Sequence, residues 1–220
     1  MIGAVLFDVD GTLVDSNDLH AGAWQQAFRH FGILLPFERI RGQIGKGGDN
    51  LIPTLVPKDV DQRMHEEIET FRSELFQRDY LHKARPFPQV CDLLRLLRED
   101  GHKIVLATSA KQAELDFHLD RIGCRELVDA TTSKDDVERS KPCPDIFEAA
   151  MAKVAPLGVD QIVVVGDSPW DIKAAAKIGV KAIAVRCGGF AEDEVIGAGA
   201  HAVYDGPEDL VARYPGWLPY

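Results

Sequence analysis

The stretch Ala4-Val5-Leu6-Phe7-Asp8-Val9-Asp10-Gly11-Thr12-Leu13 decides the fold of this chain. Its apolar run is typical of a buried strand, and the run ends on two aspartates that are one residue apart. In an open α/β sheet, ligands bind beyond the carboxyl ends of the strands, where Asp8 and Asp10 are expected. Two carboxylates so close repel each other unless a cation lies between them, and Mg²⁺ takes such oxygen ligands. The stretch alone also fits an ordinary Asp-Gly turn.

Composition limits the classes of protein to which the chain can belong. It has 220 residues, 45% apolar and 27% charged, with a formal net charge of −10 at pH 7. This acidic balance argues against a nucleic-acid partner and against an anionic membrane surface. No apolar run is long enough to span a membrane and no signal-peptide pattern is present, so we expect a cytoplasmic protein. The cysteines form no Cys-x-x-Cys pair, so we expect reduced thiols at Cys91, Cys124, Cys143 and Cys187.

The hydrophobic pattern of residues 15–84 is helical throughout. Apolar residues recur at helical spacing from Leu19 to Phe31 and again from Val60 to Leu75, with the glycine-rich segment 42–49 between these two runs. No strand pattern occurs in this part. We therefore predict an inserted all-α cap domain over residues 15–84.

From residue 85 onward, short apolar strands alternate with amphipathic helices. Strands that alternate with helices imply a parallel sheet with helices on both faces. The predicted fold class is therefore α/β, a Rossmann-like catalytic core formed by residues 1–14 and 85–220, with the cap inserted after the first strand. The predicted strands after the first are 103–107, 127–131, 162–165, 181–185 and 202–204.

Polar side chains collect where the predicted strands end, and a lysine lies in a proline-rich loop before a helix. Because the carboxyl ends of parallel strands meet at one edge of a sheet, we expect these side chains to join Asp8 and Asp10. Each alone also fits a helix cap, a turn or a solvated loop, but their occurrence at successive strand ends favours a shared site. The residues are Thr108, Ser109, Lys141, Asp167, Ser168 and Asp171.

This set of residues suits phosphoryl transfer, in which catalysis consists of positioning and of neutralising charge on the transferred group. Mg²⁺ and Lys141 can supply positive charge. The Thr108 hydroxyl and the backbone N–H groups of Ser109 and Gly11 can donate to phosphoryl oxygens. One carboxylate can attack as nucleophile and form an aspartyl phosphate, while the second transfers the proton.

Four segments resemble, in order, the four motifs of the haloacid dehalogenase superfamily, over nearly the whole chain. The resemblance is to the small-cap subgroup of phosphoglycolate phosphatase and β-phosphoglucomutase, and it implies a Rossmann-like core with a helical cap. The segments are Asp8-Val9-Asp10-Gly11-Thr12-Leu13, Thr108-Ser109, Ser140-Lys141-Pro142 with Pro144-Asp145-Ile146-Phe147, and Gly166-Asp167-Ser168-Pro169-Trp170-Asp171.

The resemblance also implies a role for each matching residue. Asp8 is expected to be the nucleophile and Asp10 the general acid and base. Mg²⁺ is expected to bind Asp8, the backbone carbonyl of Asp10 and Asp167. The expected support of the metal site comes from Ser168 and Asp171, and the expected phosphoryl ligands are Gly11, Thr108, Ser109 and Lys141.

Three functions remain open at this stage. True dehalogenases of the superfamily resemble this chain but lack the second aspartate of the first motif, so Asp10 favours a phosphatase acting on a small-molecule phosphomonoester. Sugar-phosphate mutases of the β-phosphoglucomutase type share a histidine at the place of His20, but resemble the last motif less. Receiver domains of signalling systems also phosphorylate an aspartate, which leaves a non-enzymatic phospho-aspartate switch as a further alternative.

The cap is expected to select the substrate. Gly45, Lys46 and Gly47 resemble a cap loop that faces the active site in small-cap phosphatases, and a flexible surface turn is the alternative reading. His20 and Trp24 are expected at the junction of cap and core, with Trp24 packing there. The aromatic tail 214–220 is expected to pack on the core, and the chain to be a monomer or a homodimer. The other histidines show no metal spacing and are expected at the surface: His30, His65, His82, His102, His118 and His201.

Overall fold

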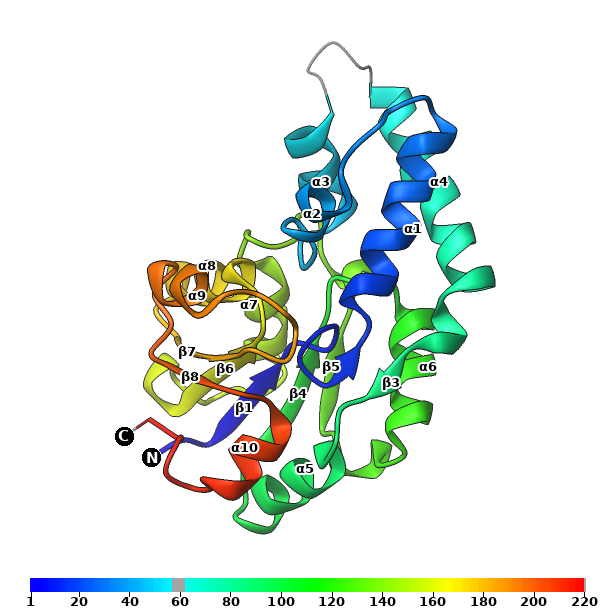
Figure 1. The fold of residues 1–220 in the computed structure, drawn as a ribbon. Helices are drawn as coiled ribbons and strands as arrows, with labels where there is room; N and C mark the ends of the chain where they lie inside the picture. Colours follow the sequence, from blue (N-terminus) through cyan, green and yellow to red (C-terminus); the bar gives the residue numbers. More distant parts are fainter. Residues whose placement is uncertain (57–61, 220) are drawn as a thin grey trace.

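A computed structural model describes residues 1–56 and 62–219, and its centre is one parallel sheet of six strands in the order β5-β4-β1-β6-β7-β8 (Figure 1). In the central strand β1, Phe7 lies opposite Leu106 of β4 on one side and Val165 of β6 on the other. This register brings the residues that follow the three strands to one edge. The α/β fold class is confirmed. The strands are β1 (Ala4–Phe7), β4 (Lys103–Ala107), β5 (Ala130–Thr132), β6 (Ile162–Gly166), β7 (Lys181–Val185) and β8 (Ala202–Tyr204).

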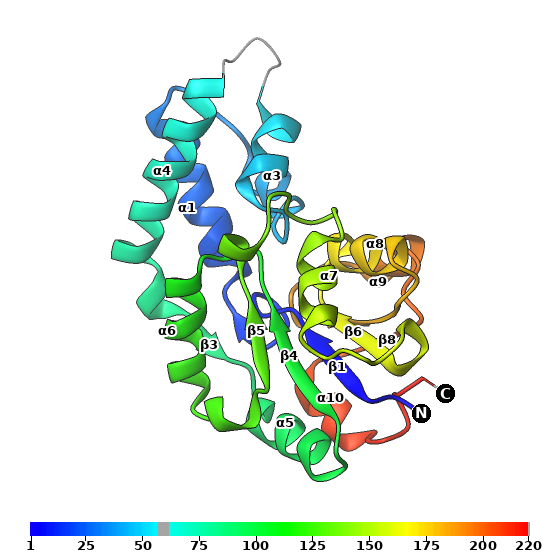
Figure 2. The same ribbon diagram turned by 180° about the vertical axis from the view of Figure 1, so that it is seen from behind.

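Helices cover both faces of the sheet, because each strand is apolar on both sides. On one face, Leu93, Leu115 and Leu210 pack in a cluster with Val5 and Phe7. On the other face, helix residues such as Phe147 and Ile172 pack against Leu6 and Val164. The first face is covered by α5 (Val90–Glu99), α6 (Gln112–Ile122) and α10 (Pro207–Ala212), and the second by α7 (Asp145–Ala152), α8 (Pro169–Lys177) and α9 (Glu192–Gly197) (Figure 2).

Between residues 15 and 85, the four described α-helices rise above the carboxyl edge of the sheet (Figure 1). They have their own apolar cluster, which contains Trp24, Phe28, Leu51 and Ile68. An antiparallel ribbon of β2 (Val14–Asp15) and β3 (Arg85–Pro86) carries the chain into and out of this layer. The helices are α1 (Asn17–His30), α2 (Phe37–Arg41), α3 (Gly48–Leu55) and α4 (Gln62–Asp79). Of the predicted helical run, Val60 lies outside the described residues.

The remaining elements are short 3₁₀ turns, and one of them shortens a predicted strand. The turn Arg125–Leu127 occupies the start of the strand predicted over 127–131, so β5 begins only at Ala130. The other turns are Leu81–Lys83, Lys134–Asp136 and Val159–Gln161.

Trp217 of the aromatic tail is buried, and its indole N–H donates to the carbonyl of Leu210 at 3.0 Å, as expected for packing on the core. No described helix is both long and apolar enough to cross a bilayer.

The expectation of reduced cysteines is wrong for one pair. Cys91 and Cys124 form a disulfide, with their Cα atoms 5.9 Å apart. Cys91 lies in α5 and Cys124 follows the C-cap glycine of α6, and the two helices pack on the same face of the sheet. Tertiary packing therefore joins cysteines that are 33 residues apart, which spacing alone does not reveal. Cys143 and Cys187 are free thiols.

Candidate active site

Asp8 follows the central strand directly and is 5% exposed. Its backbone N–H donates to the carbonyl of Val165, which fixes the carboxylate at the edge of the sheet. The carboxylate accepts a bond of 2.5 Å from the Lys141 ammonium and one of 3.2 Å from the Thr12 hydroxyl. Burial raises the pKa of Asp8 to about 7, even though the charge of Lys141 opposes the shift. An oriented carboxylate with one oxygen bound to a cation is suited to nucleophilic attack.

Lys141 is the positive centre of the site, and it is 1% exposed. Its ammonium lies 2.5 Å from Asp8 Oδ1 and 2.7 Å from Asp171 Oδ1, and it donates to the carbonyl of Ala107 at 3.2 Å. Burial alone would lower the pKa of this lysine, but the charges of Asp171 and Asp8 raise it overall. Lys141 is therefore a permanent cation in an otherwise acidic cluster.

Asp167 follows β6 and lies beside the first strand, as its place in the sequence predicts. Its Oδ2 accepts a 2.7 Å bond from the amide of Asn17. A Cβ atom at Gly188 would lie 1.8 Å from Asp167 Oδ2, and one at Gly11, whose φ is +82°, would lie 2.4 Å away. The carboxylate thus occupies a space that only glycines at these two positions leave open. Burial, and the negative charges of Asp171 and Asp8, raise the pKa of Asp167 well above its usual range.

Asp8, Asp167 and Asp171 form a possible metal site. One carboxylate oxygen from each lies within 4.8 Å of the others, and all three residues are buried. Three buried carboxylates with a single lysine leave excess negative charge, and oxygen-only ligands are those that Mg²⁺ prefers. The residues therefore fit a hard divalent cation. Ser168 supports this arrangement, since its hydroxyl and backbone N–H both donate to Asp171 Oδ2, at 2.5 and 3.1 Å.

Asp10 lies in a different electrostatic environment from Asp8, two residues away. Its Oδ1 accepts bonds from Ser16 at 2.6 Å and His20 at 3.0 Å, and the ring of His118 lies 3.4 Å away. Its Oδ2 accepts from the Thr108 hydroxyl at 3.3 Å. Burial would raise the pKa of Asp10, but His20 and His118 together lower it well below its usual range. The environments of the two carboxylates therefore move their pKa values in opposite directions, that of Asp8 upward and that of Asp10 downward.

The contacts of His20 fix its tautomer. Nδ1 lies 2.5 Å from the guanidinium of Arg72, which can only donate, so Nδ1 must accept and carries no proton. The ring proton then sits on Nε2 and is donated to Asp10. The imidazole also stacks on Phe76 with ring centroids 4.0 Å apart. The helices α1 and α4 therefore orient a carboxylate of the sheet edge.

Three predicted phosphoryl ligands lie at the site with different freedom to donate. Thr108 is buried and its hydroxyl points to Asp10. Ser109 lines the pocket, with its hydroxyl 3.5 Å from the carbonyl of Gly45. The backbone N–H of Gly11, however, donates to the carbonyl of Val14 at 2.7 Å, so it is not free to reach a phosphoryl oxygen. The tight turn after the strand uses this donor itself.

The predicted cap loop does meet the core at the pocket. Gly45 has a φ of +95°, and a Cβ there would lie 2.7 Å from the hydroxyl of Ser168. A Cβ at Gly47 would lie 2.1 Å from the hydroxyl of Ser140. Lys46 lines the pocket, but its ammonium turns outward, where it donates to Gln43 at 2.7 Å and lies 4.0 Å from the centre of the Trp170 ring. The glycines thus allow a close approach, while the amine of Lys46 is engaged elsewhere.

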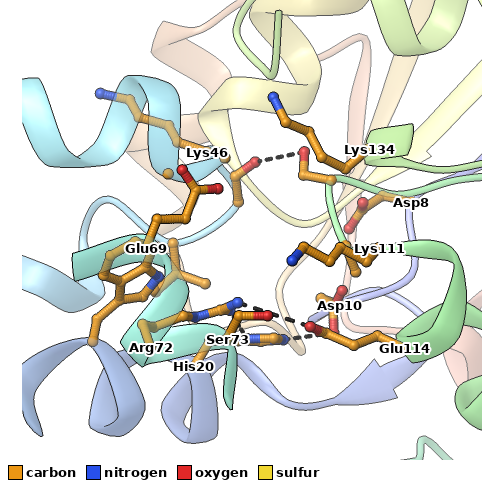
Figure 3. Close-up of a pocket in the computed structure, with 17 residues that line it drawn as sticks. Asp8, Asp10, His20, Lys46, Glu69, Arg72, Ser73, Lys111, Glu114 and Lys134 are labelled. Atoms are coloured by element: carbon orange, nitrogen blue, oxygen red, sulfur yellow. Dashed lines mark hydrogen bonds and ion pairs between the residues drawn. The ribbon is translucent and has the colours of Figure 1, made fainter. Parts of the chain in front are cut away.

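Asp8 and Asp10 form the floor of a pocket whose other walls come from α1, α4, α6 and the cap loop (Figure 3). Figure 3 shows Arg72 and Glu114 facing each other across this pocket, with His20 between Arg72 and Asp10. Lys111 and Glu69 also line it. The pocket therefore joins the two carboxylates of the floor to a region lined by further polar side chains.

Several residues of the site were not identified from the sequence. His118, expected at the surface, is 1% exposed beside Asp10, and His102 is also buried, at 9%. Glu114 and His118 lie four residues apart on the buried face of α6 with Leu115 and Leu119, a signal that the sequence does contain. Asn17, the first residue of α1, also belongs to the site, because its side-chain amide donates to Asp167.

Comparison with known proteins places the chain among hydrolases. The family model described as haloacid dehalogenase-like hydrolase matches residues 5–185. The chain is 30% identical over 216 residues to N-acetylmuramic acid 6-phosphate phosphatase of Pseudomonas aeruginosa, covering 94% of this chain and 92% of that protein. It is 30% identical over 189 residues to pyrophosphatase PpaX of Bacillus pumilus, covering 84% of this chain and 83% of that protein.

Two further similar proteins are a much longer plant protein and a bacterial hydrolase of known structure. Protein SUPPRESSOR OF QUENCHING 1, chloroplastic, of Arabidopsis thaliana is 30% identical over 196 residues, which are 84% of this chain but only 18% of that protein. The crystal structure of a hydrolase from Pseudomonas syringae superimposes with a TM-score of 0.91 and 28% identity over 99% of both chains. The similarity to this structure extends over both the sheet and the helical layer above it.

Proposed function

Since the chain belongs to the haloacid dehalogenase-like hydrolases, we propose that it is a Mg²⁺-dependent phosphatase that hydrolyses a small-molecule phosphomonoester through an aspartyl phosphate on Asp8. One observation carries this proposal. Asp8 reaches the floor of the pocket with one oxygen bound to Lys141, while Asp10 reaches the same floor bound to His20. A held nucleophile and a separate proton-transfer group are what a two-step hydrolysis needs.

In the first step, an oxygen of Asp8 attacks the phosphorus atom and the bond from phosphorus to the substrate oxygen breaks. The leaving oxygen takes a proton from the cluster that Asp10 forms with His20 and His118. The pKa of His118 is raised, because hydrogen bonding to Asp10 and its charge outweigh the effect of burial. This cluster can therefore hold a proton near Asp10 although the pKa of Asp10 itself is low.

In the second step, water attacks the phosphorus atom of the aspartyl phosphate, Asp10 accepts a proton of that water, and Asp8 is released with inorganic phosphate. Lys141 holds the transferring group throughout, and the Thr108 hydroxyl joins it by turning from Asp10 to a phosphoryl oxygen. Asp8, Asp167 and the backbone carbonyl of Asp10 would hold Mg²⁺, which would supply further positive charge to the phosphoryl oxygens. Asp171 and Ser168 keep that acidic cluster in place.

The same proposal assigns residues 15–84 to a cap domain and residues 1–14 and 85–220 to the catalytic core. The cap closes over the phosphoryl-binding floor and excludes bulk water from it. The separate apolar cluster of α1, α3 and α4 supports this division. The enzyme works in the cytoplasm as a monomer or a homodimer, and no nucleic acid or membrane takes part in its reaction.

A sugar-phosphate mutase is the second candidate, and the contact between His20 and Asp10 favours it, because mutases of the β-phosphoglucomutase type share a histidine at this place. A mutase retains the phosphoryl group for return to its substrate, whereas a phosphatase gives it to water. A phospho-aspartate switch differs from both by keeping Asp8 phosphorylated.

Phosphate release from a panel of phosphomonoesters and pyrophosphate, with Mg²⁺ or with EDTA, tests the proposal for the wild type and Asp8→Asn. We expect Mg²⁺-dependent release that the substitution abolishes. Isomerisation of a hexose phosphate without release would support the mutase. A wild type that releases no phosphate while Asp8 stays phosphorylated would support the switch.

A further inference from the structure

Glu114 is a buried carboxylate in the pocket that the hydrolytic mechanism does not use. It projects from the first turn of α6 and is 1% exposed. Its Oε2 has no hydrogen-bond partner among the described residues. Its other oxygen lies 3.9 Å from Arg72 Nη1, which is too far for a hydrogen bond. Glu114 therefore reaches the pocket with unused hydrogen-bonding capacity.

A buried carboxylate oxygen without a hydrogen-bond donor destabilises the protein when no ligand is bound. A buried acceptor left without a donor loses its hydration without replacement, and buried polar groups nearly always have a partner. The guanidinium of Arg72 donates to His20 through Nη2 at 2.5 Å, and its Nη1 stays beyond hydrogen-bond distance of Glu114. A donor brought by a ligand would satisfy Glu114 without disturbing the bond that orients His20.

The surroundings of Glu114 show what kind of ligand fits. We call Glu69, Arg72, Ser73, Lys111 and Glu114 the outer wall of the pocket (Figure 3). It mixes acceptors with donors, and in the described part of the chain the side chains of Glu69 and Lys111 show no hydrogen bond and no ion pair. Closely spaced acceptors and donors match groups that can do both, and the hydroxyl is the common one.

We propose that Glu114 accepts a hydrogen bond from a hydroxyl of the substrate's alcohol part, so that the outer wall selects polyhydroxylated phosphomonoesters, the sugar and polyol phosphates. This inference rests on the proposed phosphatase function. The phosphoryl group lies on the floor with Asp8, and the carbon chain extends toward α6. An alcohol part without hydroxyls leaves Glu114 as it is now, with an unmatched buried oxygen.

A purely structural role is the competing explanation. Glu114 also lies one helical turn before His118, and its negative charge helps to raise the pKa of His118. If that were its function, a substitution would change the protonation of the Asp10 cluster and would slow the hydrolysis of every substrate alike. The ratio between two substrates separates the explanations, because a common effect on the chemistry cancels in it.

The test compares kcat/KM for the best hexose phosphate with kcat/KM for p-nitrophenyl phosphate. The single hydroxyl of p-nitrophenol is esterified to the phosphate, so this substrate has no hydroxyl to donate to Glu114. In Glu114→Leu we expect the ratio of the two values to fall about 10- to 100-fold, the loss typical of a hydrogen bond to a charged group. In Glu114→Gln, which keeps the shape and one acceptor oxygen, we expect a smaller fall in the same direction. Asp120→Asn is the matched control, since it removes an exposed carboxylate from the same helix.

An unchanged ratio in both Glu114 variants would overturn the inference, and so would a wild type that prefers p-nitrophenyl phosphate to all sugar and polyol phosphates. Binding of a hexose phosphate to Asp8→Asn, measured by calorimetry with and without Glu114→Leu, tests the contact without turnover. We expect at least about a tenfold increase in Kd, and an equal Kd would contradict the contact. If the wild type releases phosphate from no phosphomonoester at all, the phosphatase function fails, and the calorimetric result still decides the role of Glu114.

Discussion

The carboxylates of the floor and the carboxylate of Glu114 on the outer wall differ in how completely their oxygens are paired. On the floor, Lys141 contacts Asp8 and Asp171, and Asn17 binds Asp167. On the outer wall, the carboxylate of Glu114 keeps an oxygen without a donor. The floor is thus organised before any substrate arrives, while the wall has bonds still to make.

This difference assigns different tasks to the two regions. A preorganised charge arrangement stabilises a transition state without reorganisation during the reaction. Unused hydrogen-bonding capacity instead discriminates between ligands, because a wrong ligand leaves it unsatisfied. We therefore expect substitutions on the floor to stop the reaction for all substrates, and substitutions on the wall to change the order of preference among them.

The largest effect is expected for Asp8→Asn. The amide is a poor nucleophile, so kcat should fall on the order of 10⁴-fold or more. Phosphate release under saturating substrate measures this. Asp129→Asn is the control, because that carboxylate pairs with Arg98 and Lys103 at the other end of β4. Comparable losses in both variants would mean that the effect reflects folding and not chemistry.

A smaller loss is expected for Lys141→Met, which keeps the length of the side chain but removes the charge. Without the cation, the transferring oxygens lose one stabilising partner, and kcat should fall about 10²- to 10³-fold. Removing one member of a buried ion pair should also lower the free energy of unfolding by about 3–5 kcal/mol. Chemical denaturation and phosphate release measure the two effects, and a variant with near-normal kcat would exclude Lys141 from the phosphoryl site.

The pairing on the floor also predicts how stability depends on pH in metal-free protein. The pKa of Asp8 is raised to about 7 from an unfolded value of 3.8, so the folded state keeps a proton that the unfolded state has lost. The resulting stability is complete below about pH 4 and is lost as the pH rises through 7. As the pH rises from 5 to 8, the wild type should therefore lose stability relative to Asp8→Asn, by at least about 1 kcal/mol over this range.

Urea denaturation in EDTA at several pH values measures the difference in the free energy of unfolding between the wild type and Asp8→Asn. Added Mg²⁺ should reduce it at pH 8, because the cation stabilises the ionised carboxylates of the wild type and finds fewer of them in the variant. A difference between the two proteins that does not change with pH would show that Asp8 is not the group that titrates.

The smallest effect is expected for Lys46→Ala. The ammonium of Lys46 is bound to Gln43 and lies over Trp170, outside the contacts of floor and wall. Its removal should change kcat/KM by less than about threefold for any substrate, as expected for a partly exposed interaction. A loss of tenfold or more for one class of substrate would restore the role of substrate contact that its cap-loop position suggests.

The sequence predicted the floor better than the wall, for a physical reason. Asp8 and Asp167 follow short apolar strands, and the end of a parallel strand has only one place in the fold. The wall instead depends on contacts between α4 and α6, such as that of Arg72 with Glu114, which no local pattern specifies. The disulfide of Cys91 with Cys124 was missed for the same reason.

Helical periodicity nevertheless contained part of the missing information. Glu114 and His118 share one face of α6 with Leu115 and Leu119, so their burial follows from spacing alone. The spacing of residues along α6 does not reveal which residue of α4 each of them contacts. The direction of the Lys46 amine is a similar case, since the glycines beside it determine how closely the loop approaches but not where a long side chain turns.

The most direct test of the two-step mechanism is to locate the phosphoryl group during turnover. Rapid acid quenching of the wild type with its best substrate and Mg²⁺, followed by peptide mass spectrometry, should show one phosphoryl group on the peptide that contains Asp8, and none in Asp8→Asn. Steady phosphate release without that adduct, retained by Asp8→Asn, would contradict the assignment of Asp8 as the nucleophile.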